Sequence, residues 1–413
     1  MQRYDTYKDS GVKWLGEIPS HWEMKRWRFL MSENTTKNTN CKERLQLQFR
    51  YGDIVRKVNQ SEESDVLDTI SKYTIVEPDD IMINGLNLNY DFISQRVAQV
   101  QERGVITSAY ISLRPTEIAN SRYFTYFLKS MDAKKMFHGM GTGIRLTLSY
   151  NELKNQFIPC PSPEEQTAIA NYLDTATAKI DAAIVQQQKM IDLLNERKQI
   201  IINRAVTKGL NPTAKMKDSG VEWIGEVPEH WQLLPYRYLF YNLDKLRMPI
   251  TADQRSRNNP QYDYYGASGV IDKIDYYNVD DKVLLIGEDG ANLLMRNLPL
   301  IYKAEGKFWV NNHAHILKPI RDDYDYLAYV MEAADYTLYI TGSAQPKLSQ
   351  SNLNCVKLPI PPISEQKQIV DYLSKRTGKI DDAIKESNNM ISLLQERKQI
   401  IINEVVTGKV RVI

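Results

Sequence analysis

The chain has 413 residues, with 53 Lys and Arg against 51 Asp and Glu, and its formal net charge is only +2. This length accommodates two or three domains with their own buried cores. Near-neutrality excludes a protein that binds nucleic acid through bulk positive charge, because phosphate neutralisation supplies most non-specific affinity. A DNA reader of this composition would need a few well-placed basic loops, or a partner that adds positive charge.

The sequence predicts a cytoplasmic protein. No run approaches the ~20 apolar residues that span a bilayer, and the opening MQRYDTYKDSG lacks the apolar core of a signal peptide. Cys41, Cys160 and Cys355 lie far apart, without the spacing of a zinc site or a disulfide framework. We therefore expect no membrane contact and no metal on this chain.

Two repeated segments frame the chain. Residues 8–22 (KDSGVKWLGEIPSHW) and 217–231 (KDSGVEWIGEVPEHW) are identical at 11 of 15 positions, and the octamer ERKQIIIN occurs at 196–203 and 396–403. A period of about 200 residues is far too long for a solenoid. Similar ends around dissimilar middles predict a tandem duplication with pseudo-two-fold symmetry, in which one frame carries two different readers.

The first variable part, residues 23–157, has a mixed α/β pattern and is called the first body below. Candidate strands cover 71–76, 80–83 and 104–113, and a candidate helix covers 121–130. Several loop residues offer amide, hydroxyl or basic groups suited to base edges or phosphates, although they equally fit an ordinary polar surface. These DNA-contact candidates are Arg56, Lys57, Asn84, Asn87, Thr142 and Arg145.

A long helix follows each body. Prolines precede the first helix, and Glu164 and Glu165 suit its N-terminus. Each run of about 40 residues corresponds to roughly 60 Å of helix. Apolar residues recur at steps of three and four, as in a coiled-coil seam, with Arg376 interrupting the second copy. The larger apolar residues of the seam are Ile169, Leu173, Ile180, Met190, Leu194 and Ile201 in the first copy, and Ile369, Leu373, Ile380, Met390, Leu394 and Ile401 in the second. Ala176, Ala183 and Ala383 occupy further seam positions, and the polar Gln187 fills one slot of the first copy.

Two similar stripes in one chain favour an antiparallel intramolecular coiled coil over two separate helical hairpins. The expected fold is therefore α/β (α+β), with two globular domains separated by two long antiparallel helices. The expected segments are 1–157 for the first domain, 158–209 for the first helix, 210–357 for the linker and second domain, and 358–413 for the second helix.

The second variable part, residues 232–357, is called the second body. Candidate strands cover 282–286 and 307–310, and a candidate helix covers 325–334. The Gly-rich stretches 262–270 and 287–292 fit no nucleotide-binding pattern. The paired histidines of NNHAH lack a visible third metal ligand, so sequence reading or packing is the better interpretation. The DNA-contact candidates are Tyr265, Ser268, His313, Ser343, Gln345 and Lys347.

These motifs resemble the specificity subunits of type I restriction–modification systems. The shared patterns are SGVxWxGExPxHW at the start of each half, PxPxxxEQ before each helix, the ERKQxII tail, and YYGASGV, LIGEDGA, KFWVNNHAH and GSAQPKLS in the second body. The resemblance implies two target recognition domains that each read half of a bipartite double-stranded DNA site. It also implies helices that set the spacing and bind two methyltransferase subunits, with restriction subunits completing the complex. S-adenosylmethionine, ATP and Mg²⁺ would then belong to those partners, and this chain would supply no catalytic residue.

Two other functions are alternatives to DNA recognition. A methyltransferase or nuclease acting alone is disfavoured, because the chain lacks an Asn/Asp-Pro-Pro-aromatic motif, and Asp79-Asp80 and Asp280-Asp281 suit turns better than a metal site. A coiled-coil scaffold without DNA specificity stays open, since polar loops also suit protein surfaces. The seam also makes self-association of the isolated chain plausible.

Overall fold

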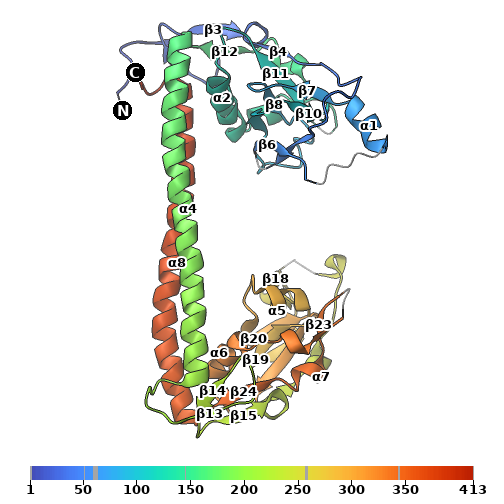
Figure 1. Cartoon of the computed structure of the whole chain (residues 1–413), viewed down its shortest axis with the longest axis vertical. Coiled ribbons are helices and arrows are strands. Elements are labelled where there is room, and N and C mark those ends of the chain that lie inside the picture. Colours follow the sequence, from blue (N-terminus) through green and yellow to red (C-terminus); the bar gives the residue numbers. More distant parts are fainter. Residues whose placement is uncertain are drawn as a thin grey trace. The chain divides into compact units, whose positions relative to one another are not determined.

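The computed structural model describes residues 2–50, 52–58, 64–144, 146–255, 259–342 and 345–412, with the side chains of 64–66 outside the description. The chain forms two compact units. The first comprises Met1–Gln188 and Asn388–Ile413, and the second comprises Lys189–Ser387. Each unit contains one mixed helix-and-strand body together with part of both long helices (Figure 1). The predicted mixed fold class is therefore confirmed.

A four-stranded antiparallel sheet, in the order β4-β11-β8-β9, forms the centre of the first body. Leu113 in the middle strand lies opposite Glu33 on one side and Ile81 on the other. Helix α2 packs against this sheet through its buried residues Phe124, Phe127 and Leu128. The elements are β3 (Glu23–Arg26), β4 (Met31–Glu33), β5 (Leu47–Arg50), β6 (Asp53–Arg56), α1 (Ser64–Ser71), β7 (Thr74–Val76), β8 (Ile81–Ile83), β9 (Val97–Gln99), β10 (Gly104–Ile106), β11 (Ile111–Pro115), α2 (Ser121–Ala133), α3 (Tyr150–Leu153) and β12 (Phe157–Cys160).

The second body contains a six-stranded sheet in the order β16-β21-β19-β20-β17-β18. Its long strands β19 and β20 pair antiparallel from Val279 opposite Phe308 to Ile286 opposite Ile301. The elements are β15 (Gln232–Pro235), β16 (Phe240–Asn242), β17 (Tyr262–Gly266), β18 (Gly269–Ile274), β19 (Val279–Gly287), α5 (Gly290–Met295), β20 (Ile301–Val310), β21 (Ala314–Pro319), α6 (Tyr324–Ala333), β22 (Ile340–Thr341), β23 (Lys347–Leu348), α7 (Gln350–Leu353) and β24 (Lys357–Ile360).

The two bodies share a core despite their dissimilar sequences. The order β4-β11-β8-β9 in the first matches β16-β21-β19-β20 in the second, and the second adds β17 and β18. The predicted strands and helices lie close to the observed ones, with two differences. The predicted strand 104–113 is divided into β10 and β11 by the turn at 107–110, and Ser71 ends helix α1 instead of beginning a strand.

Each repeated opening segment forms a hairpin. β1 (Tyr7–Asp9) pairs with β2 (Glu17–Pro19), and β13 (Met216–Asp218) pairs with β14 (Glu226–Pro228). Trp22 and Trp231, which follow the hairpins, are completely or almost completely buried. The next strand pairs with the last strand of the body, β3 with β12 and β15 with β24. The repeat therefore closes each body at the point where the long helix begins.

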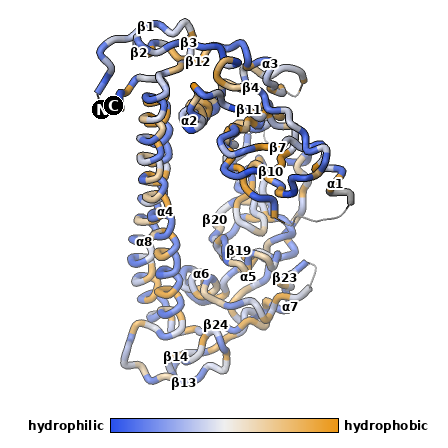
Figure 2. The backbone as a smooth tube through the Cα atoms, turned by 45° about the horizontal axis from the view of Figure 1, so that its top comes forward, coloured by the Kyte–Doolittle hydropathy of each residue, from blue (hydrophilic) through white to orange (hydrophobic). Residues whose placement is uncertain are grey.

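The long helices are α4 (Pro163–Lys208) and α8 (Ile363–Val406). Hydrophilic and hydrophobic residues alternate along both (Figure 2). In the first unit, the start of α4 lies beside the end of α8, and Lys398 Nζ is 2.7 Å from Asp181 Oδ1. In the second unit, Lys198 Nζ is 2.6 Å from Asp381 Oδ1. These pairs are related by the 200-residue offset, so the predicted antiparallel pairing and pseudo-symmetry are both present.

The seam differs from the prediction in two respects. Arg376 does not interrupt it: this side chain is exposed over the Tyr372 ring, and the neighbouring Thr377 is buried, like Thr177 in the first copy. Met190 and Met390 were predicted in the seam but are about half exposed. The remaining predicted positions are buried or half-buried: Ile169, Leu173, Ile180, Leu194, Ile201, Ile369, Leu373, Ile380, Leu394 and Ile401.

The chain ends meet in the first unit. Arg411 N–H donates to the Gln2 carbonyl at 2.9 Å, and the N and C labels lie together (Figure 2). Gly408, just after α8, has a φ of +72° and packs against Pro19 and Trp22. Gly209, just after α4, is its counterpart and packs against Trp231. Each opening segment therefore covers the end of a long helix.

We expect Gly408→Ala to lower the free energy of unfolding of the first unit by about 3 kcal/mol. A β-carbon there adds overlap with Pro19 and Trp22 to the cost of a left-handed backbone. Gly16→Ala is the matched control, because Gly16 has a φ of +70° but no atom within 4 Å of the added carbon. It should cost only about 1 kcal/mol. Urea unfolding measures both variants, and equal losses would contradict the packing argument.

Candidate nucleic-acid interface

Two loops of the first body are joined by backbone hydrogen bonds. They are residues 84–95, which follow β8, and the described part of 141–148, and together they are called the first rim. Leu148 N–H donates to Gly85 O at 2.9 Å, and Leu88 N–H donates to Leu146 O at 3.1 Å. A β-carbon on Gly85 would lie 2.5 Å from Leu148 O, so this approach requires glycine.

The second body contains the same arrangement. Its second rim consists of residues 287–300, which follow β19, and the described part of 342–349. Leu348 N–H donates to Glu288 O at 2.9 Å, and Gly290 N–H donates to Pro346 O at 2.7 Å. Leu348 and Pro346 are the 200-residue counterparts of Leu148 and Leu146. A β-carbon on Gly290 would come within 2.8 Å of the Pro346 side chain, so glycine again permits the contact.

The structure brings three of the described first-body candidates into the first rim. Asn84 is half-buried and its Oδ1 accepts from Leu86 N–H at 3.2 Å. Asn87 is exposed with a φ of +51°, and Thr142 is exposed at the base of the other loop. Arg145 belongs to that loop but lies outside the described residues.

Arg56 and Lys57 lie apart from the first rim, at the end of β6. The Arg56 guanidinium forms a two-point ion pair with Glu102, with Nη2 2.7 Å from Oε2. Both basic residues are exposed. Their contact with DNA stays a prediction, and such a contact would lie outside the loops that form the rim.

In the second rim, Gln345 is exposed and Lys347 is half-buried. Lys347 Nζ lies 3.3 Å from Glu288 Oε1, and Arg247 Nη1 lies 2.9 Å from Glu288 Oε2. Burial would raise the pKa of Glu288, but these hydrogen bonds outweigh it and lower that pKa. Lys347 is therefore part of a charged network that fixes the loop. Ser343 lies outside the described residues.

The two histidines of NNHAH have different environments. His313 is exposed, with Nδ1 3.3 Å from Asp289 Oδ2 beside the second rim. His315 is buried, with Nδ1 2.6 Å from Asp244 Oδ2 and Nε2 2.8 Å from Leu348 O. His315 is thus a packing histidine that fixes Leu348 beneath the rim. Within the described chain, no group of three or more His, Cys, Asp or Glu residues could hold a metal ion.

The structure does not present Tyr265 at the surface. This residue is 9% exposed, and its ring packs edge-on against Phe308 at 5.6 Å between centroids. Strand β17 places it in the sheet core, which the adjacent Gly-Ala-Ser-Gly turn had obscured in the sequence. Ser268 is exposed in that turn, between β17 and β18.

The role of the glutamine in the PxPxxxEQ motif was not predicted from the sequence. Gln166 Oε1 accepts from Asn120 N–H at 2.8 Å, and its Nε2 donates to Pro161 O at 2.9 Å. Gln366 repeats both contacts, with Asp323 N–H and Pro361 O. Asn120 and Asp323 are the N-cap residues of α2 and α6. The motif therefore joins each long helix to its body, and its repetition was the available signal.

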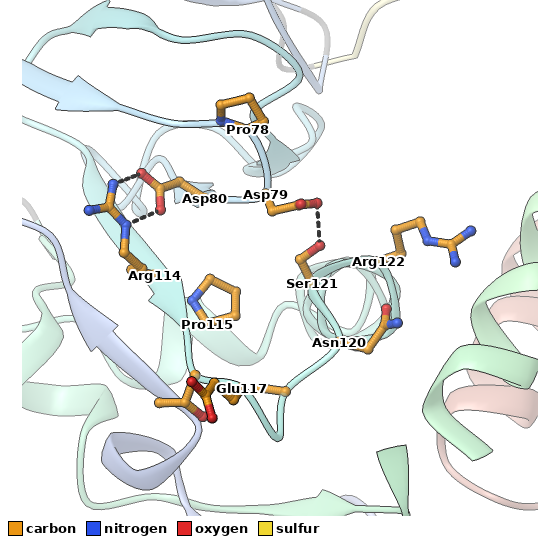
Figure 3. Close-up of a pocket in the computed structure, with 11 residues that line it drawn as sticks. Pro78, Asp79, Asp80, Arg114, Pro115, Glu117, Asn120, Ser121 and Arg122 are labelled. Carbon is orange, nitrogen blue, oxygen red and sulfur yellow. Dashed lines mark hydrogen bonds and ion pairs between the residues drawn. The ribbon is translucent and has the colours of Figure 1, made fainter. Parts of the chain in front are cut away.

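A cavity of about 480 Å³ beside the start of α2 contains many charged groups (Figure 3). Asp80 and Arg114 face each other there, with 2.6 Å between Oδ2 and Nη2, and Asp79 accepts from the Ser121 hydroxyl at 2.6 Å. Asp281 and Lys318 form the corresponding pair in the second body, 2.7 Å apart. Because these groups are satisfied by one another, the aspartates are structural. Asp79 and Asp80 lie at the turn before β8, in agreement with their interpretation as turn acids. For Asp280 and Asp281 that interpretation was wrong, because both lie within strand β19.

Comparison with known proteins identifies the family. The family model described as type I restriction modification DNA specificity domain matches residues 57–190 and again residues 240–392. The chain belongs to this family of type I DNA specificity proteins. The two matched segments correspond to the two bodies with parts of their helices, which fits recognition of two half-sites.

Curated relatives and a solved structure agree. The type I restriction enzyme MjaVIII specificity subunit of Methanocaldococcus jannaschii is 24% identical over 386 residues, covering 83% of this chain and 81% of the relative. The EcoDI specificity subunit of Escherichia coli is 20% identical over 313 residues, covering 69% of each. A chain solved in work on complex assembly and conformational transition of the type I R-M system has a TM-score of 0.68 at 12% identity, covering 95% of this chain and 99% of that one. In the part of the chain that the structure describes, no helix is long and apolar enough to cross a membrane.

Proposed function

We propose that the first rim reads one half of a bipartite duplex DNA site and that the second rim reads the other half. The observation that carries this proposal is the repeated loop pairing. Leu148 to Gly85 and Leu348 to Glu288 form the same hydrogen bond in two bodies whose surrounding side chains differ. A constant backbone with variable side chains suits the reading of two different sequences.

Rim chemistry is compatible with base reading. Amides can pair with adenine edges, guanidinium groups with guanine edges, and hydroxyl or ammonium groups with bases or phosphates. Asp289 at the second rim adds a carboxylate, which can accept from the amino group of cytosine. The proposed contact residues are Asn84, Asn87, Thr142, Arg145, Ser343, Gln345, Lys347 and His313, with Arg56, Lys57 and Ser268 as outlying contacts.

The long helices would dock two methyltransferase subunits. Met190, Leu193 and Ile200 follow helical spacing on α4 and are between 48% and 61% exposed. Met390, Leu393 and Ile400 repeat this stripe on α8, between 46% and 59% exposed. Apolar stripes of this kind indicate binding surfaces. Two similar stripes can bind two identical partner subunits, so the ratio of two methyltransferase subunits to one copy of this chain would follow from the duplication.

Under this proposal the chain contributes recognition and no catalytic residue. Adenine methylation with S-adenosylmethionine, and ATP- and Mg²⁺-dependent restriction, would be carried out by the partner subunits. The near-neutral charge of this chain fits such a division, because partners closing around the duplex can supply the positive charge that DNA binding needs.

The test is a methylation map. This chain and its methyltransferase subunit are co-expressed in a host without adenine methylation, and modified adenines are located by long-read sequencing. We expect one motif with two specific halves separated by an unread gap of fixed length. A stable complex that methylates no such motif would refute the proposal and favour a protein-interaction scaffold.

A further inference from the structure

We propose that Arg96 is the positioning residue of the first rim and that it determines specificity without touching DNA. Arg96 is only 2% exposed. Its Nη1 donates to Asn84 O at 3.1 Å and Leu86 O at 2.8 Å. Its Nη2 donates to Asn87 O at 3.5 Å and Asp91 O at 2.8 Å. One buried side chain thus gathers four carbonyl groups of the loop that carries Asn84 and Asn87.

The backbone of Arg96 fixes the base of the same loop. Its carbonyl accepts from Asn84 N–H at 2.8 Å, and its N–H donates to Asp132 Oδ2 on helix α2 at 2.7 Å. The loop is therefore tied to the core through one residue, by main chain and side chain together. The planar guanidinium, with five N–H groups, can serve several carbonyls at once, whereas the lysine ammonium has three donors on a flexible stem.

Within the loop, Leu88 is fully buried in the core, and Phe92 stacks on the His138 ring at 4.7 Å between centroids. The tip of the loop is otherwise exposed. Tyr90, Phe92 and Ile93 are 77%, 56% and 94% exposed. Local polar contacts order the tip instead: Asp91 accepts from Ser94 N–H and Ile93 N–H, and these bonds lower the pKa of Asp91 to about 2. Apart from the buried Leu88, the conformation of the tip therefore depends largely on the hydrogen bonds that converge on Arg96 and Asp91.

Both loops of the first rim depend on Arg96. Leu88, inside the loop, donates to Leu146 O, and Asn89 Nδ2 lies 3.5 Å from Ile144 O. These contacts reach the second loop of the rim, next to Arg145. Displacement of residues 84–91 would therefore also remove support from the loop that carries Thr142 and Arg145.

The second rim is fixed by different chemistry. There the charged network of Arg247, Glu288 and Lys347 joins the two loops at the surface. Arg296 is exposed and binds the end of α6 instead, where it donates to Glu332 O and Ala334 O. Loss of Arg96 should consequently act on one half-site alone.

This inference rests on the proposed function of the first rim, and Arg96→Lys tests it in the complex with the methyltransferase subunit. We expect discrimination against mismatches in one half-site to fall at least tenfold, with discrimination in the other half-site unchanged. Hydrogen exchange at the amides of 84–95 should accelerate in the same variant. Asp91→Ala, which removes the tip acceptor and leaves the buried arginine in place, should produce a smaller effect in the same half-site.

Arg103→Lys is the matched control. Arg103 is an exposed arginine of the same body, paired with Glu43 and Glu77, and its variant should keep wild-type discrimination. The inference would be overturned if hydrogen exchange at 84–95 accelerated in both Arg96→Lys and Asp91→Ala while discrimination against mismatches stayed unchanged in both variants. Equal loss at both half-sites would overturn it as well. Failure of the proposed function can be distinguished from failure of this inference. In the first case the wild-type complex would methylate no bipartite motif, and hydrogen exchange at 84–95 would still measure the order of the loop.

Discussion

The double variant Leu393→Asp, Ile400→Asp is expected to bind one methyltransferase subunit where the wild-type chain binds two. Both side chains are exposed, so carboxylates there should leave the fold intact. Burial of a Leu or Ile side chain in an interface contributes about 2 kcal/mol. Losing two of them corresponds to about 4 kcal/mol, which raises the dissociation constant roughly 1,000-fold. The cost of burying charge adds to this loss of affinity.

Native mass spectrometry of the assembled complex measures this outcome. Leu193→Asp, Ile200→Asp on α4 is the matched variant and should also lose one subunit, while the fourfold variant should lose both. Glu396→Lys, on an exposed part of α8, is the control for a change of charge alone and should keep two subunits. Retention of two subunits by the fourfold variant would show that the stripes are not the docking surface.

Asp80→Ala is expected to lower the free energy of unfolding of the first unit by about 3 kcal/mol. Asp80 is 1% exposed and accepts from Arg114, from Asn34 Nδ2 at 3.1 Å and from Glu77 N–H at 3.0 Å. Removing the carboxylate leaves the Glu77 N–H without its acceptor and takes one acceptor from Arg114, whose side chain is 43% exposed, and from Asn34, which keeps the Ile75 carbonyl. Removal of a buried partner is costlier than loss of a surface one.

Asp281→Ala is the natural control for Asp80→Ala. Its partner Lys318 is at a similar distance, but the Asp281 side chain is 27% exposed, so water can replace the lost contact. We expect a loss of about 1 kcal/mol. Hydrogen exchange localises the effects, at β8 and β11 for the first variant and at β19 and β21 for the second. Equal protection losses would mean that burial of Asp80 is not what makes the pair strong.

The frame was predictable because it is repeated and periodic. Heptad spacing specified both long helices, since an apolar stripe needs a partner along its whole length. Individual seam positions were less certain. A straight helix drifts relative to a strict seven-residue repeat, so Thr177 and Thr377 enter the seam, Met190 and Met390 leave it, and Ile202 and Ile402 are more buried than Ile201 and Ile401.

The rims were predictable only in part. Residues with base-reading chemistry, such as Asn87 and Gln345, are visible in a sequence, and the structure places both in rim loops. The hydrogen bond between Leu148 and Gly85 joins two backbone groups, so the side-chain types at these positions do not indicate it. Arg96 gave no signal either. A single arginine in a polar stretch is indistinguishable from a surface residue until its carbonyl partners are known.

The division of the chain into units has a consequence for its synthesis. The second unit, Lys189–Ser387, is continuous, whereas the first requires residues from both ends of the chain. Ile402, Val405 and Val406 belong to the same core as Trp22, Ile169 and Leu173. At about 5–20 residues per second, the earliest-made body waits roughly 10–45 seconds after residue 188 before these side chains are synthesised. The body translated first is therefore completed last. A ribosome that stops in α8 after Ser387 releases a chain whose second unit can fold while the core of the first stays open.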